Sequence, residues 1–228
     1  MNQPRFAEIL LFDFEGTLVD FQWDLKNGAL GAKQELERLG FPASAWQDNY
    51  AVLWNTAIST AKEHGLDKQA VAQRINAIYE RYDQDALSRW SLRPNVKAVL
   101  SFLKNEKQLK LGLVTNIGRK AIDAACAQFE LAGLFDVVVT RNDVELLKPN
   151  GAGIRRAIEK WEGDAARTLF VGDSVTDILA ARDARVPVAI ILGGEHGSDA
   201  ARLTAAQPTW LWRSITELKE AILAAKTG

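Results

Sequence analysis

The stretch Ile9-Leu10-Leu11-Phe12-Asp13-Phe14-Glu15-Gly16-Thr17-Leu18 decides how the rest of the chain is interpreted. Four consecutive apolar residues run directly into two acids that are one residue apart. The apolar run is too short to span a membrane and has no amphipathic helical period, so it predicts a strand buried on both faces, as in the middle of a parallel sheet. Open α/β sheets bind ligands at the carboxyl ends of their strands. Asp13 and Glu15 are therefore candidate site residues, and a solvated acidic turn is the alternative.

The composition excludes several classes of protein. Hydrophobic residues make up 47% and charged residues 25% of the 228 positions, which is typical of a soluble globular protein. Twenty-eight basic residues against 29 acidic ones leave a net charge of -1, which argues against a nucleic acid or an anionic membrane as partner. The single cysteine, Cys126, excludes an internal disulfide framework, and we expect it in the core. No signal-peptide pattern and no 18-residue apolar segment is present, so a cytoplasmic location is expected, as a monomer or a homodimer.

After the first predicted strand the pattern becomes helical. Residues 21–91 are rich in helix formers and contain no convincing buried strand, and three helices are predicted around residues 25–39, 52–57 and 71–82. From Leu92 onward helical patterns alternate with apolar runs that predict strands at residues 111–114, 136–140, 168–171 and 186–192. Ser214 and Glu217 have the spacing of a capping box that opens a last helix.

This alternation predicts an α/β fold with a doubly wound parallel sheet, because strands joined by helices form right-handed crossovers. The first strand belongs to that sheet, yet about 70 helical residues separate it from the second. We therefore expect a core formed by residues 1–20 and 92–228, and a helical unit at residues 21–91 inserted after the first strand, over the carboxyl edge of the sheet.

Polar clusters stand where the predicted strands end, and in a parallel sheet these ends share one edge. The clusters bring together four acids, one lysine and two hydrogen-bonding side chains: Asp13, Glu15, Asp173, Asp177, Lys148, Thr115 and Asn116. Four carboxylates in one pocket repel each other, so a bound cation and a basic side chain are needed to offset them. A set of oxygen ligands without His or Cys suits Mg²⁺, which often shares its ligands with a substrate phosphate.

These clusters resemble the four motifs of the haloacid dehalogenase superfamily, in order, over essentially the whole chain. The helical insertion is similar to the small helical cap of the phosphoglycolate phosphatases in that superfamily. The resemblance implies a Mg²⁺-dependent phosphomonoester hydrolase of a small phosphorylated metabolite. It implies that Asp13 is the nucleophile that forms an aspartyl-phosphate, that Lys148 holds Asp13 and the phosphate, and that Thr115 and Asn116 bind phosphate oxygens. The implied metal ligands are Asp13, the backbone carbonyl of Glu15, Asp173 and Asp177, the last directly or through water.

Two residues depart from the family pattern. Glu15 stands where family phosphatases have an aspartate that acts as general acid and then as general base. Glutamate has the same acid chemistry but one more methylene, and misplacement by about 1 Å can cost about 100-fold in rate. Glu15 can therefore be a working acid, the cause of slow turnover, or the cause of a trapped phospho-enzyme, and Glu15→Asp is expected to maintain or raise turnover. Arg185 stands where a helix-ending Gly is common, so the preceding helix is expected to end differently.

Three other functions stay open on the sequence. A 2-haloacid dehalogenase attacks carbon and needs no metal, which would leave Asp173 and Asp177 as unnecessary charges. A phosphosugar mutase would need proton-transferring residues from the helical insertion. A phospho-ligand-binding or regulatory protein with little turnover would follow if Glu15 disables hydrolysis. The candidates for the mutase, and for contacts with a leaving group, are side chains of the insertion and of one glycine-rich loop: Lys62, His64, Lys68, Trp23, Arg74, Arg81, Trp90 and His196.

Overall fold

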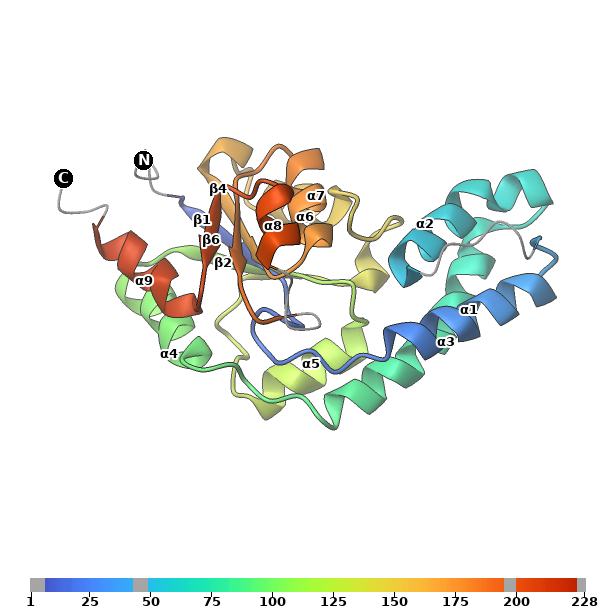
Figure 1. Ribbon diagram of the computed structural model, residues 1–228, viewed down its shortest axis with the longest axis horizontal. Coiled ribbons are helices and arrows are strands. Elements are labelled where there is room, and N and C mark those ends of the chain that lie inside the picture. The colour runs from blue at the N-terminus through green and yellow to red at the C-terminus, as the bar shows by residue number, and fades with distance from the viewer. Residues whose placement is uncertain (1–6, 43–48, 195–199, 225–228) are drawn as a thin grey trace.

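The computed structural model describes residues 7–42, 49–194 and 200–224. Its centre is a sheet of six parallel strands in the order β3-β2-β1-β4-β5-β6 (Figure 1). The strands are β1 (Ile9–Phe12), β2 (Lys110–Val114), β3 (Val137–Val139), β4 (Thr168–Gly172), β5 (Val188–Ile191) and β6 (Trp210–Trp212). The predicted α/β fold with a doubly wound parallel sheet is confirmed.

Nine α-helices are described, and shorter helical turns connect several of them. They are α1 (Leu25–Arg38), α2 (Tyr50–Thr60), α3 (Lys68–Leu87), α4 (Val96–Ser101), α5 (Arg119–Gln128), α6 (Ala152–Glu159), α7 (Val175–Asp183), α8 (Ala200–Ala205) and α9 (Ile215–Ala224). The short turns span Ala61–His64, Phe102–Glu106, Arg141–Asp143 and Ala165–Arg167. Among the described residues no helix is both long enough and apolar enough to cross a lipid bilayer.

Alternating residues of β1 pack on opposite faces of the sheet. Ile9 and Leu11 belong to a cluster with the apolar residues of α6 and α7, whereas Leu10 and Phe12 belong to the cluster that includes α4, α5 and α9. All four side chains are nearly inaccessible to solvent. A strand with apolar residues at every position is stable only between two layers of helices, and this explains the continuous apolar run in the sequence.

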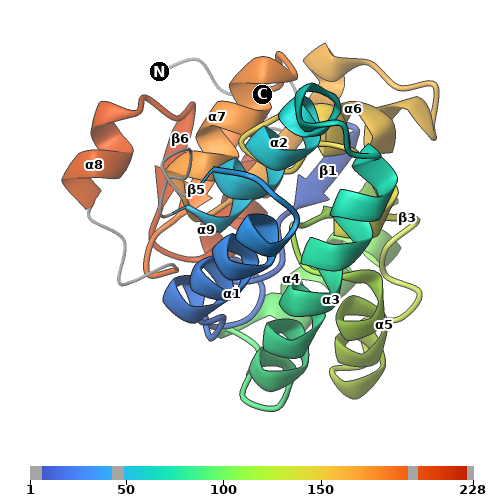
Figure 2. The ribbon, with the colours of Figure 1, turned by 90° about the vertical axis from the view of Figure 1, so that its right-hand side faces the viewer.

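The three helices α1, α2 and α3 follow β1 in the chain and pack against one another at the carboxyl edge of the sheet (Figures 1 and 2). We call them the inserted helices. Each begins at a polar residue whose side chain accepts hydrogen bonds from the first turn, namely Asp24, Asn49 and Asp67. The extent of this unit as a separate domain, residues 21–91, stays a prediction.

The two segments that connect the inserted helices to the sheet run side by side. The Asp20 amide donates to the Ser91 carbonyl at 3.1 Å, and the Arg93 amide donates to the Leu18 carbonyl at 2.9 Å. Val19 forms an antiparallel bridge with Leu92. The two connecting segments therefore stabilise each other through backbone contacts where they lead to and from the inserted helices.

The structure corrects the sequence-based expectations at two places. The strand β6 and the helix α8 were not predicted, because they are only 3 and 6 residues long. Helix α7 does end with a left-handed residue, since Arg185 has φ 58°, so the expectation of a different helix end was wrong. This left-handed conformation is unfavourable for arginine, but it lets the Val186 amide donate to the Ala181 carbonyl at 2.9 Å, which satisfies a carbonyl at the helix end. His196 lies outside the described residues.

Candidate active site

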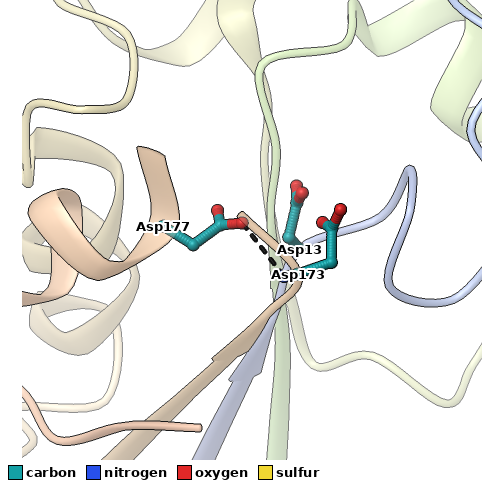
Figure 3. A group of neighbouring side chains, drawn as sticks. All are labelled: Asp13, Asp173 and Asp177. Carbon is teal, nitrogen blue, oxygen red and sulfur yellow. Dashed lines mark hydrogen bonds between the residues drawn. The ribbon is translucent and has the colours of Figure 1, made fainter. Parts of the chain in front are cut away.

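Three aspartates converge at the carboxyl edge of the sheet. Asp13 follows β1, Asp173 follows β4, and Asp177 lies in the first turn of α7 (Figure 3). One carboxylate oxygen from each lies within 4.8 Å of the other two, and all three residues are buried. The parallel registry of β1 with β4 brings the first two together. The sequence predicted only that the strand ends share one edge of the sheet, without the strand order.

Lys148 neutralises part of this negative charge. Its Nζ lies 2.7 Å from Asp13 Oδ1 and 2.6 Å from Asp177 Oδ1, and the lysine is 5% exposed. Burial alone would lower the pKa of the Lys148 ammonium, but the two carboxylates raise it above its usual range. Burial raises the pKa of Asp13 to about 6, because desolvation outweighs the attraction of Lys148. A cation beside Asp13 would lower that pKa again.

Asp177 is held by its own helix. Its Oδ2 accepts a hydrogen bond from the Asp173 amide at 3.2 Å (Figure 3). The same oxygen accepts hydrogen bonds from the Ser174 amide at 3.1 Å and the Ser174 hydroxyl at 2.8 Å. Ser174 and Asp177 form a reciprocal capping box at the start of α7. With its other oxygen bound to Lys148, Asp177 is better placed to orient its neighbours than to ligate a cation directly.

Two glycines leave room for the carboxylate of Asp173. A Cβ atom on Gly16 or Gly194 would overlap Asp173 Oδ2, so neither position tolerates a side chain while Asp173 keeps this orientation. Gly16 also has φ 81°, which other residues rarely adopt. The Thr17 hydroxyl donates to Asp173 Oδ1 at 3.1 Å. This crowded set of buried carboxylate oxygens fits a small hard cation such as Mg²⁺ in its donor chemistry.

Glu15 is fixed by the two segments that lead to and from the inserted helices. Its Oε1 accepts hydrogen bonds from the Gln22 amide at 2.9 Å, the Trp23 amide at 2.8 Å and the Trp90 indole Nε1 at 2.7 Å. Among the described residues no donor is recorded for Oε2. Burial raises the pKa of Glu15 to about 7, although the three donors act in the opposite direction. The extra methylene of glutamate thus lets one oxygen reach the connecting segments.

Thr115 and Asn116 follow β2 at the same edge. The side-chain amide of Asn116 pairs with the backbone of Lys148, donating to its carbonyl at 3.1 Å and accepting from its amide at 3.0 Å. Thr115 Oγ1 accepts a hydrogen bond from the Ile117 amide at 3.2 Å, which leaves its own proton for another acceptor. In this structure Asn116 positions Lys148, and the expected contacts of both residues with phosphate stay predictions.

A cavity of about 260 Å³ opens in front of these groups. The core side is lined by all seven residues that the sequence singled out: Asp13, Glu15, Thr115, Asn116, Lys148, Asp173 and Asp177. On the side of the inserted helices the described lining residues are Phe21, Leu25, Asn49 and Tyr50. The sequence missed these four, because nothing in their local pattern separates a cavity wall from a packed core.

Of the side chains considered for leaving-group or mutase roles, those that the structure describes are not among the residues that line the cavity. The Trp90 indole donates to Glu15 Oε1, the Trp23 indole donates to Asp83 Oδ1, and Arg74 pairs with Glu35 within the inserted helices. Lys68 pairs with Glu145 at 2.6 Å, and the His64 ring packs against Phe41 with centroids 4.6 Å apart.

The comparison with protein families identifies the chain. The model of the haloacid dehalogenase-like hydrolases matches residues 10–191, which include all seven predicted site residues. The chain belongs to this family. The predicted resemblance is therefore confirmed, and the enzyme prediction, a HAD-like phosphatase, is confirmed at the level of this family.

Among curated relatives, phosphoglycolate phosphatase of Vibrio cholerae is 30% identical, covering 97% of this chain and 99% of the relative. Phosphoglycolate phosphatase of Yersinia pseudotuberculosis is 33% identical over 82% of each chain. Among solved structures of HAD-like folds, a protein from Clostridium acetobutylicum described as a predicted phosphatase superposes with a TM-score of 0.66 at 21% identity, covering 96% of this chain and 99% of that one. The last likeness supports the fold alone.

Proposed function

We propose that this HAD-like chain is a Mg²⁺-dependent phosphomonoester hydrolase that acts on a small phosphorylated metabolite through an aspartyl-phosphate on Asp13. The observation that carries the proposal is the buried contact of Lys148 with both Asp13 and Asp177, at the floor of a cavity that also contains Thr115 and Asp173. An ammonium group beside a carboxylate favours its ionised form and fixes its orientation, as an attacking nucleophile requires.

In the first step an oxygen of Asp13 attacks phosphorus, and the bond between phosphorus and the ester oxygen breaks. Lys148 and the hydroxyl of Thr115 stabilise the charge on the phosphoryl oxygens, with Asn116 holding the Lys148 backbone. Glu15 Oε2 gives its proton to the leaving oxygen. In the second step water attacks phosphorus, Glu15 accepts the proton, and Asp13 is released with inorganic phosphate. A pKa of about 7 suits a group that acts as acid and then as base at neutral pH.

The residues that fit Mg²⁺ are the carboxylates of Asp13 and Asp173 and the backbone carbonyl of Glu15, with Asp177 contributing through water. When bound, the ion supplies positive charge that offsets the repulsion between the carboxylates and the phosphate. Gly16 and Gly194 keep the space around Asp173 clear for such a ligand set.

The curated relatives make 2-phosphoglycolate the first substrate to test. Such a substrate carries a carboxylate as well as a phosphate, and the cavity has a second basic lining residue, Arg202, on α8. The walls formed by Phe21, Leu25 and Tyr50 restrict the cavity to a compact leaving group.

A panel of phosphate esters, including 2-phosphoglycolate, tests the proposal by phosphate release with and without Mg²⁺. We expect release that requires the ion and that falls to background in Asp13→Asn. Release that persists in Asp13→Asn would refute the proposal. Binding of phosphate without any hydrolysis would favour the phospho-ligand-binding alternative, and halide release from 2-haloacids would favour a dehalogenase.

A further inference from the structure

A second buried charge cluster lies outside the aspartate site. Arg141, which follows β3, pairs with Asp83 of α3, and each residue is 1% exposed. Arg141 Nη2 donates to Asp83 Oδ2 at 2.5 Å, and Arg141 Nε donates to Asn76 Oδ1 at 2.9 Å. The guanidinium also lies over the Tyr79 ring, 5.4 Å from its centroid. The pair therefore joins the sheet to one of the inserted helices.

Arg141 holds the loop of residues 115–118, which we call the phosphate loop after its proposed role. Its Nη1 donates to the Asn116 carbonyl at 2.9 Å, and its backbone amide donates to the Ile117 carbonyl at 3.1 Å. Two successive carbonyls of the phosphate loop are therefore fixed by one residue. Asn116 is in turn the residue whose side chain holds the backbone of Lys148.

Asp83 connects the same loop to Glu15. Its Oδ2 accepts from the Gly118 amide at 3.1 Å, and its Oδ1 accepts from the Trp23 indole Nε1 at 2.9 Å. The backbone amide of Trp23 donates to Glu15 Oε1. A Cβ atom on Gly118 would lie 2.8 Å from both Asp83 Oδ2 and Arg141 Nη2, so this close approach requires glycine.

The stability of the fold does not by itself account for such a pair. Burying two charges costs desolvation energy that their attraction often fails to exceed, and apolar replacements of similar volume are often neutral or stabilising. Every donor and acceptor described above reaches either the phosphate loop, the Trp23 segment or α3. The contacts of Asp83 and Arg141 reach the phosphate loop, which carries the proposed phosphate-binding groups, and Trp23, which holds Glu15. This geometry indicates that the pair positions these two parts of the site.

We propose that the Asp83–Arg141 pair is a positioning device that sets the phosphate loop and the carboxyl of Glu15 relative to each other from a residue of the inserted helices. This inference rests on the proposed phosphatase function. Arg141 acts through the carbonyls of Asn116 and Ile117, and Asp83 acts through Gly118 and Trp23. Neither side chain is required to touch the substrate.

Three conservative variants separate the contacts of the pair with the phosphate loop from its contact with Trp23. Arg141→Lys keeps the charge but cannot bridge Asp83 and Asn116 at once. Asp83→Asn keeps the shape but removes the charge. Trp23→Phe keeps the ring packing and the backbone bond to Glu15 but removes the bond to Asp83. The matched control is Lys68→Gln, which breaks another ion pair between α3 and the core, with Glu145, at the exposed surface.

Steady-state hydrolysis of the best ester gives kcat and KM, and calorimetry with inorganic phosphate and Mg²⁺ gives the phosphate affinity. We expect Arg141→Lys and Asp83→Asn to lower kcat by about 10- to 100-fold and to weaken phosphate binding, since displacements near 1 Å have such effects. Trp23→Phe should lower kcat while phosphate affinity stays within twofold. Lys68→Gln should change neither quantity.

Thermal unfolding establishes that each variant is folded. If the single changes prevent folding, the double variant Asp83→Asn with Arg141→Met, which removes both charges of this pair, carries the same expectation as Arg141→Lys. Folded variants with wild-type kcat and wild-type phosphate affinity would overturn the inference. A wild-type protein that binds phosphate but hydrolyses no ester would refute the proposed function alone, because phosphate affinity would still report on the position of the loop.

Discussion

The side-chain amide of Asn55 pairs with the backbone of Leu147, one residue before Lys148. Its Nδ2 donates to the Leu147 carbonyl at 2.9 Å, and its Oδ1 accepts from the Leu147 amide at 2.7 Å. The Trp54 indole donates to the Glu145 carbonyl at 2.9 Å beside it. Helix α2 therefore fixes the loop that carries the proposed catalytic lysine, just as α3 fixes the phosphate loop.

Asn55→Asp should reduce kcat about tenfold, because the new carboxylate cannot donate to the Leu147 carbonyl and repels it, and small displacements of Lys148 are costly. The control is Thr56→Ala, at the next position of the same helix. Steady-state kinetics on the best ester checks the prediction. Equal kcat in both variants would show that the loop keeps its position without α2.

Lys148→Met should abolish measurable hydrolysis and destabilise the protein by about 3–5 kcal/mol, because removing one partner of a buried ion pair leaves uncompensated charge. Asp13 and Asp177 then face each other without a cation. We therefore expect Mg²⁺ to raise the melting temperature of Lys148→Met more than that of the wild type. Thermal unfolding with and without Mg²⁺ measures this, and an identical response of both proteins would contradict the expected cation site.

Glu15→Gln tests the acid separately from its structural contacts. The amide oxygen of glutamine can accept the same three hydrogen bonds from Gln22, Trp23 and Trp90, but it has no acidic proton. We expect kcat to fall by about 10²- to 10⁴-fold, the usual contribution of a general acid, with an unchanged melting temperature below about pH 4.5, where Glu15 is neutral in the wild type. Full activity in Glu15→Gln would remove Glu15 from the chemistry.

Glu15→Asp is now expected to lower turnover, in contrast to the expectation from the sequence. The shorter side chain cannot place its oxygen at the three donors and still present the second oxygen to the cavity. Assays of Glu15→Asp beside Glu15→Gln decide between the two expectations. If Glu15→Asp maintains or raises turnover, the expectation from the sequence is correct and the one from the structure is wrong.

The pH profile of kcat/KM should be bell-shaped. The alkaline limb follows loss of the proton from Glu15, with a pKa of about 7, and should disappear in Glu15→Gln. The acidic limb follows protonation of Asp13, with a pKa of about 6 before a cation binds, and should move to lower pH as Mg²⁺ increases. Rates measured from pH 4 to 9 at two Mg²⁺ concentrations test both limbs.

The raised pKa of Glu15 also makes the stability of the folded protein depend on pH. The pKa of Glu15 is raised in the folded protein, so its neutral form is favoured there, and stability is lost as pH rises from about 4.5 through about 7. Glu15→Gln removes this loss. Its free energy of unfolding, relative to that of the wild type, should therefore increase over that pH range, as denaturant titrations at pH 5 and pH 8 would show.

Arg185→Gly should stabilise the protein by about 0.5–1 kcal/mol, because a left-handed residue other than glycine costs more than the added backbone entropy of glycine. Arg185 is exposed, at the end of α7. Thermal unfolding measures the change, and activity should stay at the wild-type level. A lower melting temperature would mean that the arginine makes a compensating contact.

Patterns within the chain were sufficient to predict the sheet and most of its helices. The continuous apolar runs of β1, β2 and β4 can be stable only in a sheet covered on both faces, and their polar ends must share an edge. Asp13, Thr115 and Asp173 were identified for this reason, whereas Lys148 was identified from a polar cluster just before a predicted helix. Short elements such as β6 were missed, because three residues carry too little pattern to separate a strand from a loop.

The sequence alone determined the chemistry available to this protein: a buried acid at the end of β1, further acids after β4, and one lysine to balance them. The tertiary structure alone decided which atoms those groups contact. Glu15 is bound by Trp23 and Trp90, and Arg141 by Asp83, across separations of 8, 75 and 58 residues. Such partners depend on how the inserted helices pack over the sheet, and no local pattern encodes that packing, since the same polar residues would equally suit a solvated helix face.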